Sequence, residues 1–272
     1  HKCEKPGLDS RFRGNDLIRY VLIFVTLMLI LLPTISMKAE EPLYVIPLKP
    51  DPPFTVDGDL SDWQGVPNQF NLNTKAHVTW SPDRWKGPSD LSAKGWLAWR
   101  TGVLYVAVEV ADDVVTQKRS GSDIYLGDHV ELYLDFQPSH ETERASFGEG
   151  QWTIGISPGS LTNTGNPQTD IKPEVFCYRP ANHSLKGVQV AAKRTPTGYT
   201  LEAAFPFEVL KIGAVDQNTE VNGELAISDC DSAEPKQEKM KTLSMRPWES
   251  SRLRLGPMVF GDAAGKGSLP PR

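Results

Sequence analysis

The side chains in this sequence that are best suited to binding chemistry are aromatic rings in or beside segments of turn composition. They are Trp80, Trp85, Trp152, Tyr178 and Trp248. An exposed flat ring can stack on the apolar face of a pyranose, while nearby polar groups select the sugar hydroxyls. These five residues are therefore candidate carbohydrate-binding residues. The alternative is that the rings anchor loops to the protein core.

A second set of candidate residues is acidic and flanks one connection between two expected strands. It comprises Asp112, Asp113, Asp123, Asp128 and Glu131. Carboxylate oxygens in such number suit Ca²⁺, so Asp112, Asp113, Asp128 and Glu131 are candidate metal ligands and structural calcium is the expected cofactor. The alternative is a solvated face with hydrogen-bonded turn carboxylates. A pair of carboxylates about 5–9 Å apart can also hydrolyse glycosides. Because no other catalytic signature accompanies these acids, we expect no enzyme.

Three further aspartates, Asp57, Asp59 and Asp62, resemble the start of a calcium loop. The later glycine and bidentate glutamate of such a loop do not follow at the required spacing. Asp57 and Gly58 form a strong turn signal, and Asp59 can cap one helical turn. We therefore expect these acids to shape a turn and Trp63 to be a buried plug.

The elements that must position these residues are strands. In residues 104–113 the side chains of Leu104, Val106, Val108 and Val110 share one face, and in residues 127–135 the apolar side chains alternate with polar ones in the same way. Side chains alternate across a strand, so each segment has one apolar and one polar face. This pattern is typical of antiparallel sheets with one face on a core and the other toward water.

Short strands with turn residues between them recur along the rest of the chain. They are expected at residues 43–48, 76–80, 95–100, 151–157, 174–178, 187–193, 199–205, 224–229 and 252–260, with hairpins at 101–102 and 195–198 and short helical turns at 59–63 and 207–210. In the strand at 151–157, Trp152 shares a face with Ile154 and Ile156. No stretch shows a sustained helical period, so the fold class is an all-β antiparallel sandwich.

The N-terminal part reads as a leader rather than as part of this fold. Residues 20–32 are an apolar run with Arg19 before it and small residues after it, which is too short to span a bilayer comfortably but suits a secretory signal. We therefore expect residues 1–36 to be a leader and signal peptide, or alternatively an uncleaved anchor. One domain at residues 41–260 and a flexible tail at 261–272 would follow. The expected location is secreted, periplasmic or on the cell surface.

Charge and cysteine content limit the partners. The chain has 29 basic and 34 acidic residues, a net charge of −5, and no basic cluster. This balance is unsuited to the phosphate backbone, so we expect no nucleic-acid partner. Cys177 and Cys230 would be permitted to pair in an oxidising compartment, or they are two separately buried thiols.

Four segments in order give the sequence a family resemblance. Residues 54–63 (FTVDGDLSDW), 96–113 (WLAWRTGVLYVAVEVADD), 127–135 (GDHVELYLD) and 198–207 (GYTLEAAFPF) together resemble the family 9 carbohydrate-binding module, a sandwich of the jelly-roll or DOMON-like kind. The resemblance covers about residues 54–260. It implies a non-catalytic module that binds a poly- or oligosaccharide between aromatic rings and has structural calcium ions nearby.

The resemblance also implies roles for particular residues. The family's acidic strand motif falls on Asp128, Glu131 and Asp135, and its loop acids fall on Asp112 and Asp113. The sequence departs from the family pattern at the insert 81–90 and in the loop after residue 137, where a ligand site would vary.

Two other functions remain open from the sequence. One is a haem-binding electron-transfer domain of the DOMON-like kind, which needs axial ligands. The available residues are His77, His129, His140, His183, Met240, Met245 and Met258, and no Cys-x-x-Cys-His motif occurs. The other is a cell-surface interaction module without a small ligand, since fold does not fix function.

Overall fold

The computed structural model describes residues 41–137, 150–166, 169–232, 234, 236–246 and 255–270. The expected leader at residues 1–36, Trp248 and His140 lie outside these ranges. Within them, no helix has the length and apolar character needed to cross a membrane.

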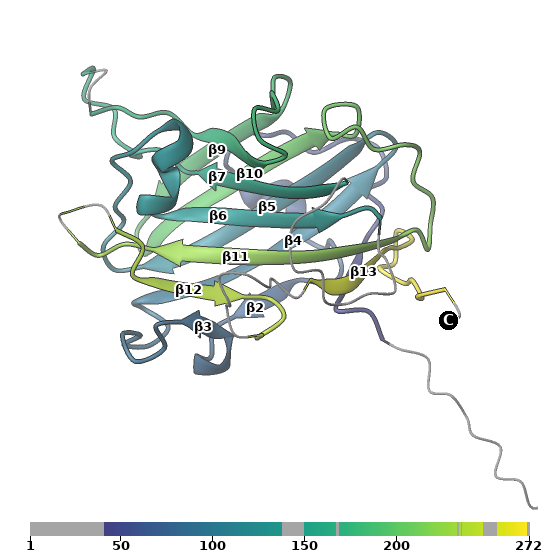
Figure 1. The fold of residues 1–272 in the computed structure, drawn as a ribbon, viewed down its shortest axis with the longest axis horizontal. Coiled ribbons are helices and arrows are strands. Elements are labelled where there is room, and N and C mark those ends of the chain that lie inside the picture. The colour runs from purple at the N-terminus through teal and green to yellow at the C-terminus, as the bar shows by residue number, and fades with distance from the viewer. Residues whose placement is uncertain are drawn as a thin grey trace, which may run out of the picture. The chain divides into compact units, whose positions relative to one another are not determined.

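A larger sheet of eight strands faces the viewer in Figure 1. Its main order is β1-β13-β11-β6-β7-β8, and β12 and then β3 continue it from β11. Neighbours are antiparallel except β1 and β13, which are parallel. The strands are β1 (Tyr44–Ile46), β3 (Val78–Trp80), β6 (His129–Asp135), β7 (Gln151–Ser157), β8 (Glu174–Arg179), β11 (Glu220–Asp229), β12 (Lys239–Thr242) and β13 (Gly256–Phe260).

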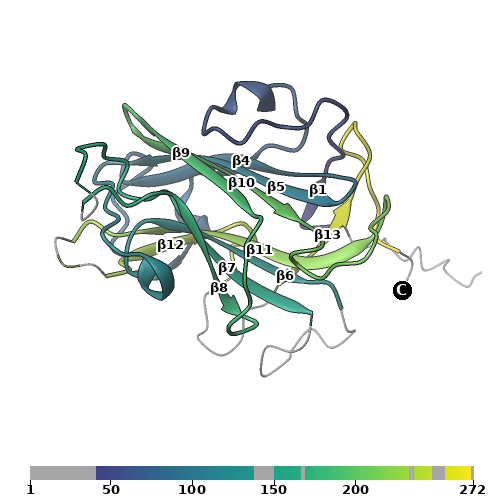
Figure 2. The same cartoon turned by 90° about the horizontal axis from the view of Figure 1, so that it is seen from above.

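A smaller, antiparallel sheet packs against the larger one, and Figure 2 shows the two as layers. Its five strands follow the order β2-β4-β5-β10-β9, with β2 (Phe70–Leu72), β4 (Leu91–Arg100), β5 (Val103–Asp112), β9 (Gln189–Thr195) and β10 (Gly198–Pro206). Both expected hairpins are present, between β4 and β5 and between β9 and β10. At the first, Gly102 has φ of 83°, a conformation that glycine adopts without strain. The predicted antiparallel β-sandwich is therefore confirmed.

Helical structure in the described residues is limited to three short 3₁₀ segments. These are η1 (Leu60–Trp63), η2 (Lys75–His77) and η3 (Gly121–Leu126). The helical turn expected at residues 59–63 is η1. Residues 207–210 form hydrogen-bonded turns instead, for example from the Leu210 N–H to the Pro206 carbonyl.

The core lies between the two sheets and follows the predicted alternation. Leu104, Val106, Val108 and Val110 of β5 are buried there, and Val130, Leu132 and Leu134 of β6 face them from the other sheet. The opposite face of β6 differs from the expectation of a solvated surface, because all seven residues of the strand are buried. The outer face of the larger sheet, meaning the face turned away from the smaller sheet, is thus itself partly buried along β6.

Residues 54–63 cover the outer face of the smaller sheet, meaning the face turned away from the larger sheet. Phe54 and Trp63 stack with ring centroids 3.7 Å apart and cover Trp96 and Tyr105. The buried carboxylate of Glu202 on β10 accepts a hydrogen bond from Trp63 Nε1 at 2.7 Å. Trp63 is therefore the buried plug that the sequence predicts.

Glu202 also binds the turn that the sequence predicts before η1. Its Oε2 accepts bonds from the backbone N–H of Gly58 at 2.7 Å and of Asp57 at 3.1 Å. Gly58 has φ of 82°, and a Cβ there would lie 3.0 Å from the β9 backbone, so only glycine fits closely. Asp59 caps η1 through Ser61 N, and Asp62 accepts from Thr55 N. The turn-and-cap interpretation of these aspartates is confirmed.

Candidate functional site

The predicted aromatic residues do not converge on one place. Trp80, the last residue of β3, is 40% exposed. It pairs with Met240 of β12, which packs on the outer face with Tyr133 and Ala226. Paired residues of neighbouring strands point to the same side. Trp80 therefore lies on the outer face of the larger sheet, at its β3 edge.

Trp85 anchors the insert 81–90 to the body of the domain. Its Nε1 donates to the Leu91 carbonyl at 2.8 Å, and its ring packs against the core. The Lys241 ammonium lies 4.1 Å from the ring centroid and also donates to the Thr74 carbonyl. Burial lowers the pKa of Lys241 to about 8. The hydrogen bond to Leu91 and the lysine over the ring are anchoring contacts of Trp85, the alternative to sugar binding that the sequence leaves open.

Trp152 lies in the core, on the same side of β7 as Ile154 and Ile156. Its ring meets His183 edge to face at 4.8 Å. Trp152 also lines a cavity of about 530 Å³ with Phe136, Leu210 and Ile212, at the end of the sandwich where β6 ends. The structure therefore separates Trp152 from the outer face where Trp80 lies.

Tyr178 is the predicted aromatic residue that belongs to a cluster, here called the aromatic platform and made of Tyr125, Phe176 and Tyr178. The Tyr178 ring centroid lies 6.4 Å from that of Tyr125 and 4.9 Å from that of Phe176, both in edge-to-face arrangement. Tyr125 is 42% exposed. A Cβ at Gly155 would lie 2.9 Å from the Tyr178 ring, so the glycine lets Tyr178 lie close on the sheet. The platform sits where η3 crosses the outer face over β7 and β8.

Next to the platform, β6 places polar side chains on the same face. Glu131 pairs with Gly155 across the strands and keeps 11% of its side chain exposed. Its Oε2 accepts from the Tyr133 hydroxyl, and its Oε1 lies 3.4 Å from His129 Nε2. Burial alone would raise the pKa of Glu131, but the His129 and Tyr133 contacts outweigh burial and lower the pKa. Glu131 is therefore an anion held beside aromatic rings.

A second buried acid on this face, Glu224, serves the backbone. Its carboxylate accepts hydrogen bonds from the N–H groups of Leu225, Leu243 and Ser244, at 2.8 to 3.1 Å. Burial raises the pKa of Glu224 to about 7 in spite of these bonds. Glu224 thus holds the segment after β12 against β11.

The predicted metal ligands lie in two separate places. Asp112 and Asp113, at the end of β5, join Asp231, with one carboxylate oxygen of each within 4.8 Å of the others. Asp231 follows β11 and is a residue that the sequence did not single out. Glu131 belongs to the face beside the platform instead. The structure therefore brings two of the four predicted ligands together with a new one.

The fourth predicted ligand, Asp128, adjoins this group and holds two loops. Its Oδ2 accepts from Thr116 N and its Oδ1 accepts from Cys230 N at 2.8 Å. Burial, followed by the charges of Asp112 and Asp229, raises the pKa of Asp128 well above its usual value. Asp128 thus ties the β5–β6 connection to the segment after β11.

Six carboxylates meet at this end of the sandwich, where β11 ends and β6 begins, at the left in Figure 1. We call this group the acidic end; it consists of Asp90, Asp112, Asp113, Asp128, Asp229 and Asp231. Burial raises the pKa of Asp112 to about 6 and that of Asp229 to about 8. In the described part of the chain, Asp112 Oδ2, Asp231 Oδ1 and the fully buried Tyr199 hydroxyl have no hydrogen-bond partner. Unmatched buried oxygens and a surplus of negative charge suit a divalent cation.

The described cysteines and histidines each have local surroundings of their own. Cys177 and Cys230 are free, buried thiols. Each described histidine has a local partner: His77 Nδ1 bonds Thr74 at 2.9 Å, His129 Nδ1 bonds the Gly127 carbonyl at 2.7 Å and His183 Nε2 bonds the Val209 carbonyl at 2.7 Å. The separate-thiol alternative therefore describes this structure.

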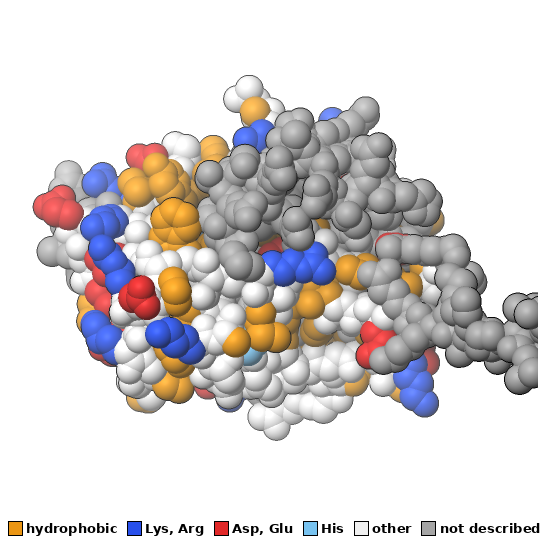
Figure 3. All heavy atoms as spheres, turned by 60° about the horizontal axis from the view of Figure 1, so that its bottom comes forward, with side chains coloured by type: hydrophobic (Ala, Val, Ile, Leu, Met, Phe, Trp, Pro, Cys, Tyr) orange, Lys and Arg blue, Asp and Glu red, His pale blue; other side chains and the backbone are white. Residues whose placement is uncertain are grey.

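Figure 3 shows a further part of the surface, on which charged side chains of both signs are interspersed with hydrophobic ones. Trp80 and Met245 are among the exposed large hydrophobic residues of the domain, with exposures of 40% and 50%. Isolated exposed apolar residues are common on soluble domains. The aromatic platform is distinguished by having neighbouring rings and a buried anion in one place.

Comparisons with known proteins agree with this architecture. The structure is similar to a carbohydrate-binding module family 9 from Caldicellulosiruptor kristjanssonii in complex with cellotriose, with a TM-score of 0.55, 15% identity, and coverage of 84% of this chain and 98% of that one. A second structure from this organism, in complex with glucose, gives a TM-score of 0.52, 16% identity, and coverage of 80% and 95%. At these identities the likeness shows the fold alone. A search of curated proteins found no match.

A family model decides the classification. The model described as "Carbohydrate family 9 binding domain-like" matches residues 56–263, from the turn before η1 to beyond β13. The chain therefore belongs to the carbohydrate family 9 binding domain-like family.

Proposed function

We propose that this domain binds carbohydrate at the aromatic platform and does not catalyse a reaction. The observation that carries the proposal is that the exposed Tyr125 meets Tyr178 beside the anionic Glu131. Membership of a carbohydrate-binding family, and likeness to modules in complex with cellotriose and glucose, support the same class of ligand.

The platform and Glu131 offer the two kinds of contact that a pyranose needs. Aromatic rings take the CH groups of one sugar face, a contact worth about 1 kcal/mol for each well-placed ring. A carboxylate accepts hydrogen bonds from hydroxyls at the sugar edge, and such charge-assisted bonds are about twice as strong as neutral ones. Because the Tyr133 hydroxyl already orients Glu131, the carboxylate is fixed before the ligand arrives.

The environment of Glu224 supports binding without catalysis. A glycosidase needs two carboxyl groups free to exchange protons or to attack the substrate. A pKa of about 7 would suit a general acid, but three backbone N–H groups hold the Glu224 carboxylate. Glu131 is an anion oriented by Tyr133, and Glu224 is hydrogen-bonded to the backbone. This pair therefore suits a binding surface rather than a catalytic site.

Calorimetric titration with glucose and cellotriose tests the proposal. We expect saturable binding, and we expect Glu131→Gln, which keeps the shape of the side chain and removes its charge, to raise Kd about tenfold or more. Glu109→Gln is the matched control, because Glu109 is an exposed carboxylate on the smaller sheet that pairs with Lys94 at 2.9 Å. Equal affinity in both variants, or no heat with either sugar, would contradict the proposal. Release of reducing sugar would contradict its non-catalytic part.

We further propose a structural calcium ion held by Asp112, Asp113 and Asp231. The unpartnered Asp112 Oδ2 and Asp231 Oδ1 support this choice, because hard oxygen ligands are the ones that Ca²⁺ prefers. The ion would supply positive charge beside Asp112, whose pKa burial raises to about 6. In the described residues, no Lys or Arg forms an ion pair with Asp112 or Asp113.

Thermal unfolding with and without chelator tests the calcium proposal. An ion that binds only the native state raises its stability, so EDTA is expected to lower Tm and added CaCl₂ to restore it. Asp113→Asn should remove most of this response, because it takes away the charge of one of the three proposed calcium ligands. Asp113 is exposed, so we expect the substitution itself to leave the fold intact. A Tm that ignores EDTA and CaCl₂ would overturn the proposal.

We also propose that the N-terminal segment exports the domain to the periplasm, the cell surface or the medium. The apolar run at residues 20–32 behind Arg19 supports export. N-terminal sequencing of protein recovered from cell fractions tests this assignment. A start near residue 37 is expected, whereas an intact segment in the membrane fraction would indicate the uncleaved anchor.

A further inference from the structure

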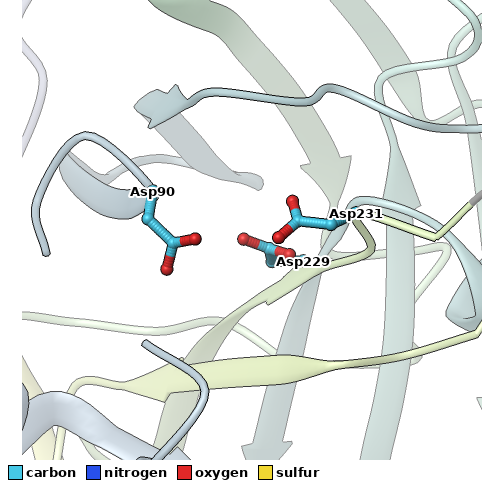
Figure 4. A group of neighbouring side chains, drawn as sticks. All are labelled: Asp90, Asp229 and Asp231. Atoms are coloured by element: carbon cyan, nitrogen blue, oxygen red, sulfur yellow. The ribbon is translucent and has the colours of Figure 1, made fainter. Parts of the chain in front are cut away.

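One position in the acidic end is already filled by a cation of the protein itself. The ammonium of Lys239, which is 1% exposed, lies 2.8 Å from Asp90 Oδ1, 3.2 Å from Asp229 Oδ2 and 3.0 Å from Asp231 Oδ2. Figure 4 shows these three carboxylates turned toward one another. Apart from the lysine, the three aspartates offer oxygens within 4.8 Å of each other, a spacing compatible with a metal ion.

We propose that Lys239 is a tethered cation that fills one of two adjoining cation positions and so limits the acidic end to a single divalent ion. The inner position is the group Asp90, Asp229 and Asp231, and the outer position is the group Asp112, Asp113 and Asp231. The single divalent ion in the outer position rests on the calcium ion proposed above. The assignment of Lys239 to the inner position depends only on the contacts of the described residues.

The two positions share Asp231, which turns its Oδ2 toward Lys239 in the inner position and has its Oδ1 left for the outer position. Oδ2 accepts from Lys239, while Oδ1 has no hydrogen-bond partner in the part of the chain that the structure describes. Asp112 divides in a similar way, since its Oδ1 accepts from Val114 N at 2.8 Å and its Oδ2 has no partner. One oxygen of each residue is therefore available to the outer position.

The inner position has the composition of a metal site except for its occupant. Asp229 is fully buried, and its Oδ1 has no hydrogen-bond partner among the described residues. Lys86 lies on the solvent side, 3.5 Å from Asp90 and 3.4 Å from Asp231, and is 68% exposed. Lys239 is thus the one buried positive charge that the described residues place among these three acids. A divalent ion would supply more charge in the same space.

The sheet register delivers Lys239 to this position. Lys239 is the first residue of β12 and pairs directly with Asp229, the last residue of β11. Directly opposed residues of antiparallel strands have neighbouring side chains on the same face. The ammonium is therefore fixed by backbone pairing rather than by a flexible approach from solvent.

Calcium stoichiometry measured on metal-stripped protein tests the proposal. The full domain and the variants Lys239→Met and Lys239→Arg are treated with EDTA, dialysed and titrated with CaCl₂, and bound calcium is counted by elemental analysis. We expect Lys239→Met to bind one ion more than wild type and Lys239→Arg to bind the wild-type number. Without calcium, Tm of Lys239→Met should be lower by roughly 10 °C, as expected for breaking a buried ion pair, and CaCl₂ should recover most of this loss.

The outcomes separate this inference from the calcium proposal. If Lys239→Met binds no additional ion and calcium does not raise its Tm beyond the wild-type response, the tethered-cation inference is wrong, whatever wild type binds. If wild type binds none and Lys239→Met binds one, the inference stands and the outer calcium site fails.

A double variant covers the case in which Lys239→Met does not fold. Asp229→Asn combined with Lys239→Met removes the buried ammonium together with one of the carboxylates that it contacts, so we expect this protein to fold without calcium and to bind no more calcium than wild type. A double variant that also fails to fold, or that binds an additional ion, would show that charge balance is not the role of Lys239.

Discussion

The connection between β5 and β6 contributes residues to both the acidic end and the aromatic platform, yet the two regions use polar groups differently. At the acidic end, carboxylates are consumed by backbone N–H groups and by Lys239, so these acids hold loops together. At the platform, Tyr125 remains exposed, and the Glu131 carboxylate is flanked by Tyr133 and His129. In this domain, the many acids of the acidic end hold loops together. The single acid beside the aromatic rings, Glu131, lies where we propose that a ligand binds.

The two regions are joined by one side chain. Gln117 Nε2 donates to the Ile124 carbonyl of η3 and to the Asp128 carbonyl, both at 3.0 Å. Ile124 is buried and precedes Tyr125 in the chain. Substitutions that act on the acidic end alone, or on the platform alone, therefore show whether stability and binding are separate properties.

The largest expected effect is on stability, from Asp128→Ala. Two backbone N–H groups, of Thr116 and Cys230, would lose their acceptor in a buried site, which costs roughly 3 kcal/mol in free energy of unfolding. Asp128→Asn keeps one acceptor oxygen and should lose less. Urea unfolding measures both. An Asp128→Ala midpoint equal to that of wild type would show that the acidic end does not tie these loops.

The next effect is on binding, from Tyr125→Ala. Loss of one exposed ring should weaken cellotriose binding by about 1 kcal/mol, roughly a factor of five in Kd, while Tm stays unchanged because the ring is 42% exposed. Tyr125→Phe keeps the ring and is the control. Calorimetry and thermal unfolding on the same samples decide the result. A large fall in Tm with intact affinity would reverse the roles assigned to the two regions.

An effect on stability is also expected from pH. Burial raises the pKa of Asp112 to about 6, of Glu224 to about 7 and of Asp229 to about 8. In the unfolded chain these pKa values lie near 4, so between about pH 4 and 8 the folded state binds more protons and stability falls as pH rises. In EDTA we therefore expect Tm to be higher near pH 5 than near pH 8, and calcium to reduce the difference.

The control for the pH effect separates the two regions again. Glu224→Gln should remove the contribution of Glu224, on the outer face, to the change of Tm with pH. It should leave the response of Tm to calcium intact. A Tm in EDTA that rises from pH 5 to pH 8 would contradict the assignment of these buried acids.

The smallest effect is expected from Trp80→Ala. Five strand spacings separate β3 from β8 on the outer face, roughly 24 Å at the usual spacing, so one short sugar does not reach both Trp80 and Tyr178. We expect cellotriose affinity to be unchanged and stability to change by less than about 0.5 kcal/mol. A loss of affinity similar to that of Tyr125→Ala would move the binding site toward the β3 edge.

The sequence predicts well where long alternation and turn chemistry coincide. The strands β5 and β6, both hairpins and the buried Trp63 follow from period, glycine and cap signals. The alternation in β7 already grouped Trp152 with Ile154 and Ile156, and the structure places all three in the core. Period was therefore a better guide to burial of an aromatic residue than its proximity to a loop.

Other features depend on long-range pairing that no local pattern shows. The strand β12 is only four residues long and contains two lysines, so its sequence resembles a surface loop, yet all four residues are buried. Lys239 and Lys241 become interior because partners arrive from β11 and from the insert around Trp85. The sequence did not identify Tyr125 as a site residue for a similar reason. The segment η3 has no strong sequence signal, and Tyr125 joins the aromatic platform only because the fold brings η3 next to Tyr178 of β8.

The strand β1 and the ring of Phe54 have a practical consequence, because both precede the family match that begins at residue 56. A recombinant domain trimmed to that boundary would lose the parallel partner of β13 and the ring that covers Trp63. It would present an open sheet edge and uncovered tryptophan to other molecules, a combination that promotes aggregation. Expression trials should therefore begin before Tyr44.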